Sequence, residues 1–416
     1  MESPPKKDVQ FYRFAAYGFL KNLRFFEPFL VLFFRDQGFS FLQIGFFFSV
    51  REVSTNLLEI PTGVVADLFG RRISMVLSMV GYLLSFGLFF FFPTLAWIFV
   101  AMVFFAVGEA FRTGTHKAMI LEYLRLKGWG KWKASYYGST RAASQLGSAA
   151  NALIAAGLVF FSGSYRIVFV ASMVPYFLNL LNLASYPKVL DGERSPGSSR
   201  ATLGQFFQVF TNPRALQGLL NGATFDAFFE VAGNFLQPIL KSLALALPVF
   251  LFLEGQQREA IVIGVAFFGI YLATSLASAR AGHFQQKVGS AEKALNATFL
   301  LGVALLTFSG VFVLWGFSIG SVAAFFGLYL LHNLRRPLTV SYVSDQIHHR
   351  TMASGLSVES SLKTLLMAIC APIAGWVADR FGIGWALLSG GIVLGGLFFA
   401  LRFSPPSFPK IPGKEG

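Results

Sequence analysis

The sequence contains little cysteine and little charge. Its 416 residues include one cysteine, Cys370, which excludes an intramolecular disulfide framework and any metal site built from several cysteines. Charged residues make up 13% of the chain, whereas hydrophobic residues make up 55% and the mean hydropathy is +0.60. A soluble domain of ordinary composition has about a quarter of its residues charged. The composition therefore excludes a soluble enzyme and predicts an all-α membrane protein.

Acidic residues are scarcer than basic ones, 20 against 34, which gives a net charge of +14. A basic chain that binds nucleic acid places its Lys and Arg on one patch or stripe. Here the basic residues lie in short connections between apolar blocks. We therefore expect no nucleic-acid partner and attribute the positive charge to membrane topology.

Motifs of several other protein classes are absent from the sequence. Residues 1–8 contain no apolar core followed by a small-residue cleavage site, so no removable signal peptide is expected. His116, His348 and His349 lack a third ligand at a useful spacing, so we expect no metal and no other cofactor. No ATP-binding loop occurs, and no nucleophile and base form a recognisable motif. The chain is accordingly predicted not to be an enzyme.

Apolar blocks about 20 residues long, the length of a bilayer-spanning helix, dominate the sequence. Phe alone occurs 50 times. The least regular segment is 237–254, where Pro238 and Pro248 interrupt an apolar run and a loop with a partial helix is expected. Twelve transmembrane helices are predicted, at 11–34, 41–66, 73–92, 95–118, 139–161, 167–186, 215–238, 259–280, 293–315, 319–343, 353–377 and 385–402.

The connections between these spans differ in their content of Lys and Arg. If both termini are cytoplasmic, most of these residues fall on the cytoplasmic side, as the positive-inside rule requires. We therefore expect an integral protein of the cytoplasmic (inner) membrane with both termini in the cytoplasm. The longest polar interval, 187–214, is expected to link two six-helix bundles, residues 1–186 and 215–416.

One short stretch of sequence occurs twice. Residues 63–72 read Gly-Val-Val-Ala-Asp-Leu-Phe-Gly-Arg-Arg and connect the second span to the third, while residues 375–382 read Gly-Trp-Val-Ala-Asp-Arg-Phe-Gly and connect the last two spans. In the first copy, Gly63 is expected to let a neighbouring helix approach closely, and Gly70 to permit the chain reversal. Two matching turns predict two pseudo-symmetric halves.

The first copy resembles the signature loop between the second and third helices of the major facilitator superfamily. That loop has a Gly, three residues, an Asp, a basic residue, any residue, a Gly and then basic residues. Leu68 departs from the pattern, because the family usually has Arg or Lys there, and the later copy ends in Ile383 and Gly384. The resemblance implies the family's twelve-helix fold, with helices one, four, seven and ten lining a central cavity.

The resemblance also implies a gate at the first copy. In the family this loop locks the cytoplasmic ends of the two halves while the cavity faces outward. Asp67 would then contact the end of a neighbouring helix, and Arg71 and Arg72 would contact acidic residues such as Glu122. Alternatively, the arginines only anchor the topology. Because the later copy lacks basic residues at its end, we expect it to be a packing device more than a charge latch.

Many ionisable side chains lie inside the predicted spans, where each costs about 2.5–3.5 kcal/mol at the bilayer centre. We therefore expect them to face a cavity or one another. Spans two and five contain Arg51, Glu52, Glu59 and Arg141. The candidate residues for a substrate or proton pathway are Lys21, Arg24 and Glu27 in span one, Glu109 and Arg112 in span four, Asp226 and Glu230 in span seven, and Arg335 and Arg336 in span ten.

These buried charges allow two interpretations. The carboxylates are candidate proton carriers, and Arg112 and Arg335 are candidates for binding an anionic group of a substrate. In the other interpretation, the charges form a fixed structural network. Glu359 and Lys363, spaced i, i+4, are expected to be a structural ion pair that holds span eleven against a neighbour.

The leading hypothesis is a secondary active transporter of a small molecule that works by alternating access and uses an ion gradient, expected to be protons. Phe-rich spans favour export of an amphipathic compound, whereas the arginines favour a small organic anion moved with protons. The alternative is a lipid-handling or sensor protein that has the transporter fold without coupled transport. Contact with membrane lipid and a monomeric state are also expected.

Overall fold

The computed structural model describes residues 7–191, 212–346 and 352–403, and these contain helices and no strands. Eight of the described helical segments are long and apolar enough to cross a membrane. The first half contains α1 (Val9–Lys21), α2 (Leu30–Asp36), α3 (Phe41–Phe69), α4 (Arg71–Phe91), α5 (Leu95–Arg112), α6 (Thr115–Leu126), α7 (Lys133–Ser162) and α8 (Ile167–Ala184), with short 3-10 turns η1 (Glu27–Phe29), η2 (Gly130–Trp132) and η3 (Lys188–Asp191). The second half contains α10 (Pro213–Gly233), α11 (Leu236–Ala246), α12 (Gly255–Ala279), α13 (Ala281–Val288), α14 (Ala291–Leu314), α15 (Ser318–Gln346), α16 (Met352–Phe381) and α17 (Ile383–Leu401).

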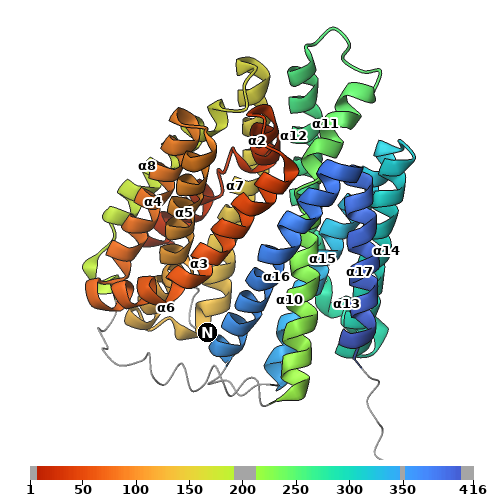
Figure 1. Cartoon of the computed structure of the whole chain (residues 1–416). Coiled ribbons are helices and arrows are strands. Elements are labelled where there is room, and N and C mark those ends of the chain that lie inside the picture. The colour runs from red at the N-terminus through yellow and green to blue at the C-terminus, as the bar shows by residue number, and fades with distance from the viewer. Residues whose placement is uncertain (1–6, 192–211, 347–351, 404–416) are drawn as a thin grey trace, which may run out of the picture.

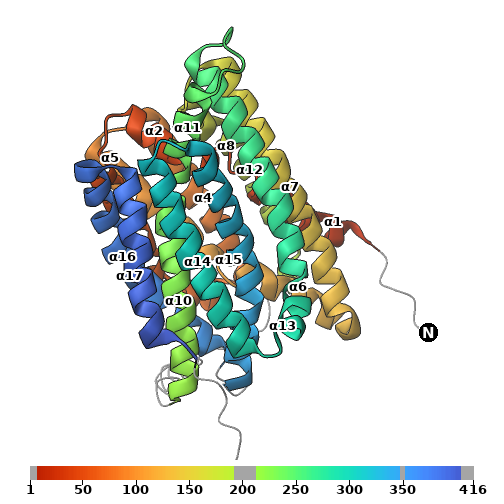
Figure 2. The same ribbon diagram turned by 90° about the vertical axis from the view of Figure 1, so that its right-hand side faces the viewer.

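The two halves stand side by side, with their long helices running in roughly the same direction (Figure 1). Two helix pairs join them: α3 packs on α16, and α7 packs on α12. The first pair is visible in Figure 1 and the second in Figure 2. The start of α1 (Figure 2), the start of α10 and the end of α17 (Figure 1) lie towards one end of the molecule, called here the terminus-side end. The expected linker, 187–214, lies mostly outside the described residues.

The duplicated turns have the same backbone geometry. Gly70 ends α3 and begins α4 with a φ of 98°, and Gly382 ends α16 and begins α17 with a φ of 96°. Positive φ values of this kind strain any residue with a Cβ atom, so glycine is needed at both positions. The predicted chain reversal at Gly70 is confirmed, and its match at Gly382 supports the pseudo-symmetry of the halves.

Three of the predicted spans are broken rather than continuous. The first span stops at Lys21 and resumes in η1 and α2, where Pro28 removes a backbone N–H donor. The fourth is divided into α5 and α6 at Gly114, which has a φ of 74°. The seventh ends as α10 at Gly233 and continues as α11, which covers much of the expected loop with partial helix. In membrane transporters, such breaks occur where backbone lines a cavity or is buried in protein.

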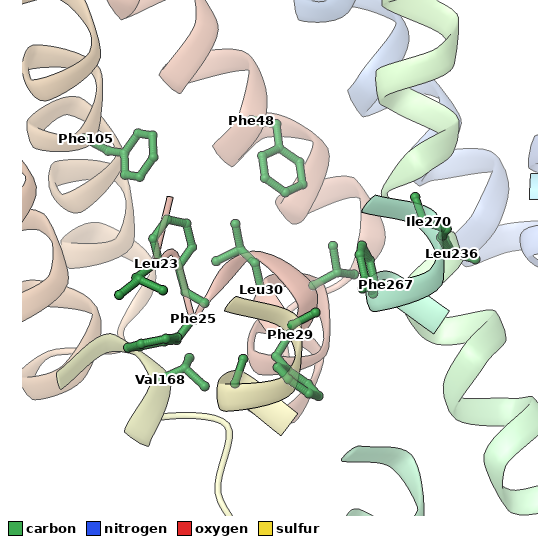
Figure 3. Packing of buried hydrophobic residues seen from close by; sticks show 14 of the residues in the cluster. Leu23, Phe25, Phe29, Leu30, Phe48, Phe105, Val168, Leu236, Phe267 and Ile270 are labelled. Carbon is green, nitrogen blue, oxygen red and sulfur yellow. The ribbon is translucent and has the colours of Figure 1, made fainter. Parts of the chain in front are cut away.

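The broken first span packs against both halves through apolar side chains. Figure 3 shows Leu30 of this segment next to Phe48 of α3 and Phe267 of α12, with Phe29 below them in the view. All four belong to one buried cluster that includes residues of every large helix around the midplane. This packing holds the broken segment at the boundary between the halves. Backbone N–H and C=O groups that lack helix partners at the break can therefore form hydrogen bonds there.

Candidate functional site

A cavity of about 480 Å³ lies between the two halves. Its lining combines charged groups of both signs with aromatic rings, a composition typical of small-molecule sites. Helices from both halves contribute to it, including the broken first and seventh spans. The lining residues are Arg24, Phe26, Glu27, Leu30, Phe48, Arg51, Glu52, Thr55, Phe105 and Glu109 from the first half, and Phe229, Glu230, Gly233, Asn234, Gln237, Phe267, Tyr271, Tyr329, Lys363 and Met367 from the second.

The charges of the first half are arranged as ion pairs at the wall of this cavity. Arg24 Nη2 lies 2.8 Å from Glu109 Oε1, and the other carboxylate oxygen of Glu109 accepts a hydrogen bond from Arg112. Glu109 therefore joins the broken first span to the fourth. A second pair, Arg51 and Glu52, has a separation of 2.8 Å and belongs to α3. Each pair offers hydrogen-bonding groups to the cavity without a large net charge.

In the second half, Lys363 forms its ion pair with Glu230 and not with Glu359. Lys363 Nζ of α16 lies 2.6 Å from Glu230 Oε1 of α10, across the cavity wall. The expected pair within α16 is therefore wrong. Glu359 lies instead against Gly222 of α10, where the missing side chain leaves room for its carboxylate. The i, i+4 spacing describes one helix only, and the long Lys side chain reaches a closer carboxylate on the facing helix.

Glu27 is an exposed carboxylate that faces the cavity and has no ion-pair partner among the described residues. Its backbone is held from the other half, because Gln237 Nε2 donates a 2.9 Å hydrogen bond to the Glu27 carbonyl oxygen. The Oε1 atom of Gln237 accepts a 2.8 Å hydrogen bond from the Val31 N–H. Tyr271 and Tyr329 line the same cavity. Glu27 is thus a charged group on a fixed backbone with space in front of it.

Two predicted pathway residues of the second half lie away from the central cavity. Asp226 Oδ1 of α10 lies 3.2 Å from His332 Nε2 of α15, and neither residue lines the cavity. Arg336 is exposed and is also not part of the lining. The structure therefore places Asp226 and Arg336 outside the group formed by Arg24, Glu27, Glu109 and Glu230.

Arg335 is fully enclosed within the second half, with 1% of its surface exposed. Its guanidinium donates hydrogen bonds to the Leu295 carbonyl oxygen at 2.6 Å, to Thr298 Oγ1 at 2.9 Å and to Asn221 Oδ1. It also lies over the ring of Phe225, 4.6 Å from its centroid. These contacts connect α15 to α14 and α10, so the geometry gives Arg335 a packing role in place of the predicted contact with a substrate.

Among the described residues, no hydrogen bond or ion pair joins the first copy of the duplicated turn to the second half. Asp67 is exposed, and no hydrogen bond or ion pair joins it to another described residue. No atom lies within 4 Å of a Cβ built on Gly63, so the expected close approach at this glycine is wrong for this conformation. Asp191 of η3 accepts a 2.8 Å hydrogen bond from the Arg72 N–H. The turn is therefore fastened within its own half.

The proposed partner of the two arginines is also different. Glu122 pairs with Arg125 of its own helix at 2.7 Å, and no described hydrogen bond joins it to Arg71 or Arg72. A spacing of three residues puts the Glu122 and Arg125 side chains next to each other on one face of α6. Arg125, rather than Arg71 or Arg72, is therefore the ion-pair partner of Glu122.

The later copy of the turn forms a charged contact between the halves. Asp379, at the end of α16, accepts hydrogen bonds from the Phe41 N–H at 2.9 Å and the Leu42 N–H at 2.8 Å. These N–H groups begin α3, and a carboxylate is favoured at a helix N-terminus. A Cβ on Gly375 would meet the backbone of Phe41 and Leu42. The expectation of a packing device was therefore incomplete, because the contact depends on a carboxylate as well as on close packing.

Several residues that line the site were not identified as candidates from the sequence. Gln237 is the main example, because its amide holds the first span, yet its only sequence signal is its position before Pro238 at the edge of a span. Tyr271 and Tyr329 are ordinary aromatic residues within apolar helices. Lys21 and Arg112, which were expected in the same site, line a second cavity.

Comparison with known proteins agrees with this arrangement. The family model of the Major Facilitator Superfamily matches residues 14–362. The chain belongs to this superfamily. It is 23% identical over 248 residues to the uncharacterized MFS-type transporter YxaM of Bacillus subtilis (strain 168), a match that covers 56% of this chain and 58% of YxaM.

Solved structures of this superfamily have the same fold. The nucleoside transporter NupG superposes with a TM-score of 0.77 at 12% identity, covering 96% of this chain and 100% of NupG. A POT family transporter in complex with 5-aminolevulinic acid superposes with a TM-score of 0.72 at 13% identity, covering 95% and 97% of the two chains. The superfamily member described here is a multi-pass membrane protein with two bundles of helices around a central cavity.

Proposed function

We propose that this superfamily member is a secondary active transporter that binds a small polar solute in the central cavity and moves it by alternating access. The observation that carries the proposal is the charged cavity of about 480 Å³ at the boundary between the halves. A site placed there changes its exposure when one half rotates against the other. Residues 1–186 and 215–416 would be the two moving units, joined by the linker 187–214.

The contacts between the halves support this proposal, because they lie towards one end of the molecule. Along α3 and α16 they run from the Asp379 contact to a 3.2 Å hydrogen bond between Asn56 and Ser361. No described hydrogen bond joins the last twelve or so residues of α3 to the second half. Between the terminus-side parts of α7 and α12 lies a polar hollow of about 340 Å³ lined by Arg141 and Thr274. The arrangement is that of a carrier open towards its termini.

The membrane orientation of the proposed transporter follows from its charge. The protein would lie in the cytoplasmic (inner) membrane with both termini in the cytoplasm. The open end would then face the cytoplasm, and most Lys and Arg residues of the connections would lie on that side. The protein would act as a monomer, because the cavity is formed within one chain.

Coupling to protons is assigned to Glu27. A carboxylate in a cavity inside a membrane is costly while charged, so proton binding and solute binding can depend on each other there. Glu52, Glu109 and Glu230 each have a basic partner within 2.8 Å, whereas Glu27 has none among the described residues. Glu27 is therefore the carboxylate of this cavity that has no ion-pair partner among the described residues.

The lining supports a solute with polar groups at opposite ends. The first half offers Arg24 and Arg51, the second half offers Glu230 with Lys363, and each half adds an aromatic ring, Phe105 and Phe229, to the lining. A small organic anion moved with protons fits the arginines, and an amphipathic compound moved by proton exchange fits the rings. Of the superposed structures, one is a nucleoside transporter and the other is a transporter in complex with 5-aminolevulinic acid, and both of these molecules are small and polar.

The test is proton movement in sealed vesicles that contain the purified protein and a pH-sensitive dye. Pools of small organic anions and of amphipathic cations are added in turn to the parent, to Glu27→Gln and to Asp36→Asn. We expect one pool to move protons, Glu27→Gln to abolish this movement, and Asp36→Asn, an exposed carboxylate outside the cavity, to retain it. If no pool moves protons, coupled transport is refuted and a lipid-handling role takes its place.

A further inference from the structure

A second cavity of about 480 Å³ lies inside the first half, between α1, the start of α6 and α7. It shares no lining residue with the central cavity. The ion pairs of Glu109 separate the two, because Arg24 and Glu109 line the central cavity while Arg112 lines the second one. The second cavity is thus distinct from the central cavity, to which the transport proposal assigns the binding of solute and proton.

The charge of the second cavity is of one sign. Lys21, Arg112, Lys117 and Arg141 line it, and none of the described residues in its lining is acidic. Arg112 is already paired with Glu109, but Lys21 has no ion-pair partner among the described residues. Lys117 and Arg141 are exposed, so they mark an open side from which a charged ligand can enter. A cavity with this balance attracts anions and repels cations.

The break in the fourth span adds a backbone element to this positive region. Gly114 is the N-cap of α6, a helix of 12 residues, and no side chain caps its first N–H groups. Gly114, His116 and Lys117 all line the cavity, so this helix N-terminus adjoins it. Free N–H groups and the positive end of the helix dipole favour a bound anion. In transporters, half-helices that begin inside the membrane are known to face anionic groups of this kind.

Polar groups on the other walls complete the lining. Tyr17 of α1 is 3% exposed, and its enclosed hydroxyl lies beside Arg112. Thr140 and Ser144 of α7 add hydroxyl groups on the facing wall. The Thr140 and Ser144 hydroxyls can donate hydrogen bonds to an anion that enters the cavity.

We propose that this second cavity binds an anion that carries a phosphate or carboxylate group, held by Lys21, Arg112 and the N-terminus of α6. Phosphate and carboxylate oxygens accept several short hydrogen bonds from such donors. The anionic group can come from a soluble organic anion or from the headgroup of an acidic phospholipid, since both present the same chemistry to the site. Lys21 is the residue whose replacement tests the site, because it has no ion-pair partner among the described residues.

The experiment measures binding and needs no transport. The full-length protein is placed in phosphatidylcholine nanodiscs, and its unfolding temperature is followed while inorganic phosphate or succinate replaces chloride at constant ionic strength. We expect phosphate or succinate to raise the unfolding temperature, with an apparent affinity that Lys21→Gln weakens about tenfold. Lys21→Arg should retain the affinity, and Lys133→Gln, an exposed cation of α7 outside the cavity, should leave it unchanged.

A second arm identifies the source of the anionic group. Nanodiscs with added phosphatidylglycerol are compared with pure phosphatidylcholine in the absence of added solute. If phosphatidylglycerol raises the unfolding temperature of the parent but not of Lys21→Gln, the ligand is a lipid headgroup. If neither phosphate, succinate nor phosphatidylglycerol distinguishes the parent from Lys21→Gln while that variant remains folded, the anion site is refuted. The transport proposal is unaffected by that outcome, because it depends on Glu27 in the other cavity.

Discussion

Arg335 is the clearest example of a charge that serves the fold. Its replacement by Met removes the donor for the Leu295 carbonyl, for Thr298 and for Asn221, which are buried and have little access to water. Leaving buried acceptors unpaired costs about 1–3 kcal/mol. We therefore expect Arg335→Met to lower the unfolding temperature of the detergent-purified protein.

The neighbouring residue provides the control for this measurement. Arg336 is exposed and has the same charge, so Arg336→Met should leave the unfolding temperature nearly unchanged. Equal losses of stability in the two variants would show that the guanidinium contacts of Arg335 contribute nothing specific.

At the scale of single residues, the sequence predicted which helices bear charge but not which charges meet. Arg24, Glu27, Glu109 and Glu230 were predicted as cavity residues, and all four line the cavity. Whether a side chain faces its own half or the boundary depends on the rotation of each helix, which packing determines. For that reason the sequence could not distinguish Arg335, which is buried within its own half, from the charged residues that line the cavity.

Among the secondary-structure elements, α3 and α16 carry the contact that closes one end of the cavity. Removing the charge of Asp379 weakens its two hydrogen bonds to the start of α3, because a carboxylate binds helix N–H groups more strongly than a neutral amide does. We expect Asp379→Asn to increase the population of molecules that are open at this end. Spin labels on Thr94→Cys and Trp315→Cys, in an otherwise Cys370→Ala background, would show a longer distance component.

The control for this experiment is Asp36→Asn, which removes a nearby exposed carboxylate that makes no bond between the halves. Its distance distribution should match that of the parent. The latch assigned to Asp379 would be disproved by identical distributions in all three proteins.

The helix breaks mark the limit of prediction at this scale. The sequence shows Pro28 and Gly114 within two of the predicted spans. Membrane helices tolerate isolated Gly and Pro residues, so these residues do not by themselves predict a break. The break after Gly233 depends on a contact with the other half, since Gln237 binds the first span. Long-range contacts of that kind leave no periodic signal in the chain.

The whole molecule is expected to expose its cavity on one side only in this conformation. In a Cys370→Ala background, Thr55→Cys places a thiol on the cavity wall. A maleimide that does not cross membranes should label it from the terminus side of the membrane and not from the other. Lys127→Cys, directly after α6, and Phe252→Cys, between α11 and α12, report the two sides, because these two connections lie at opposite ends of the molecule (Figure 1).

Labelling of Thr55→Cys from the side of Phe252 alone would contradict the described direction of opening. Labelling from both sides would show that the halves exchange between two openings during the experiment.

The twelve spans and the two-half plan could be predicted from hydropathy and the repeated turn, whereas the conformation could not, because the same sequence must be compatible with both openings.

The Asp379 latch also has a consequence for mutational tolerance. Its donors are the backbone N–H groups of residues 41 and 42, which every amino acid except proline supplies. In a saturation mutagenesis screen, the latch would therefore be lost through many substitutions at Asp379 but, on the α3 side, mainly through proline. Asp379 therefore tolerates few substitutions, whereas residues 41 and 42 tolerate most. The sequence at the start of α3 can change in evolution while the Asp379 latch is retained.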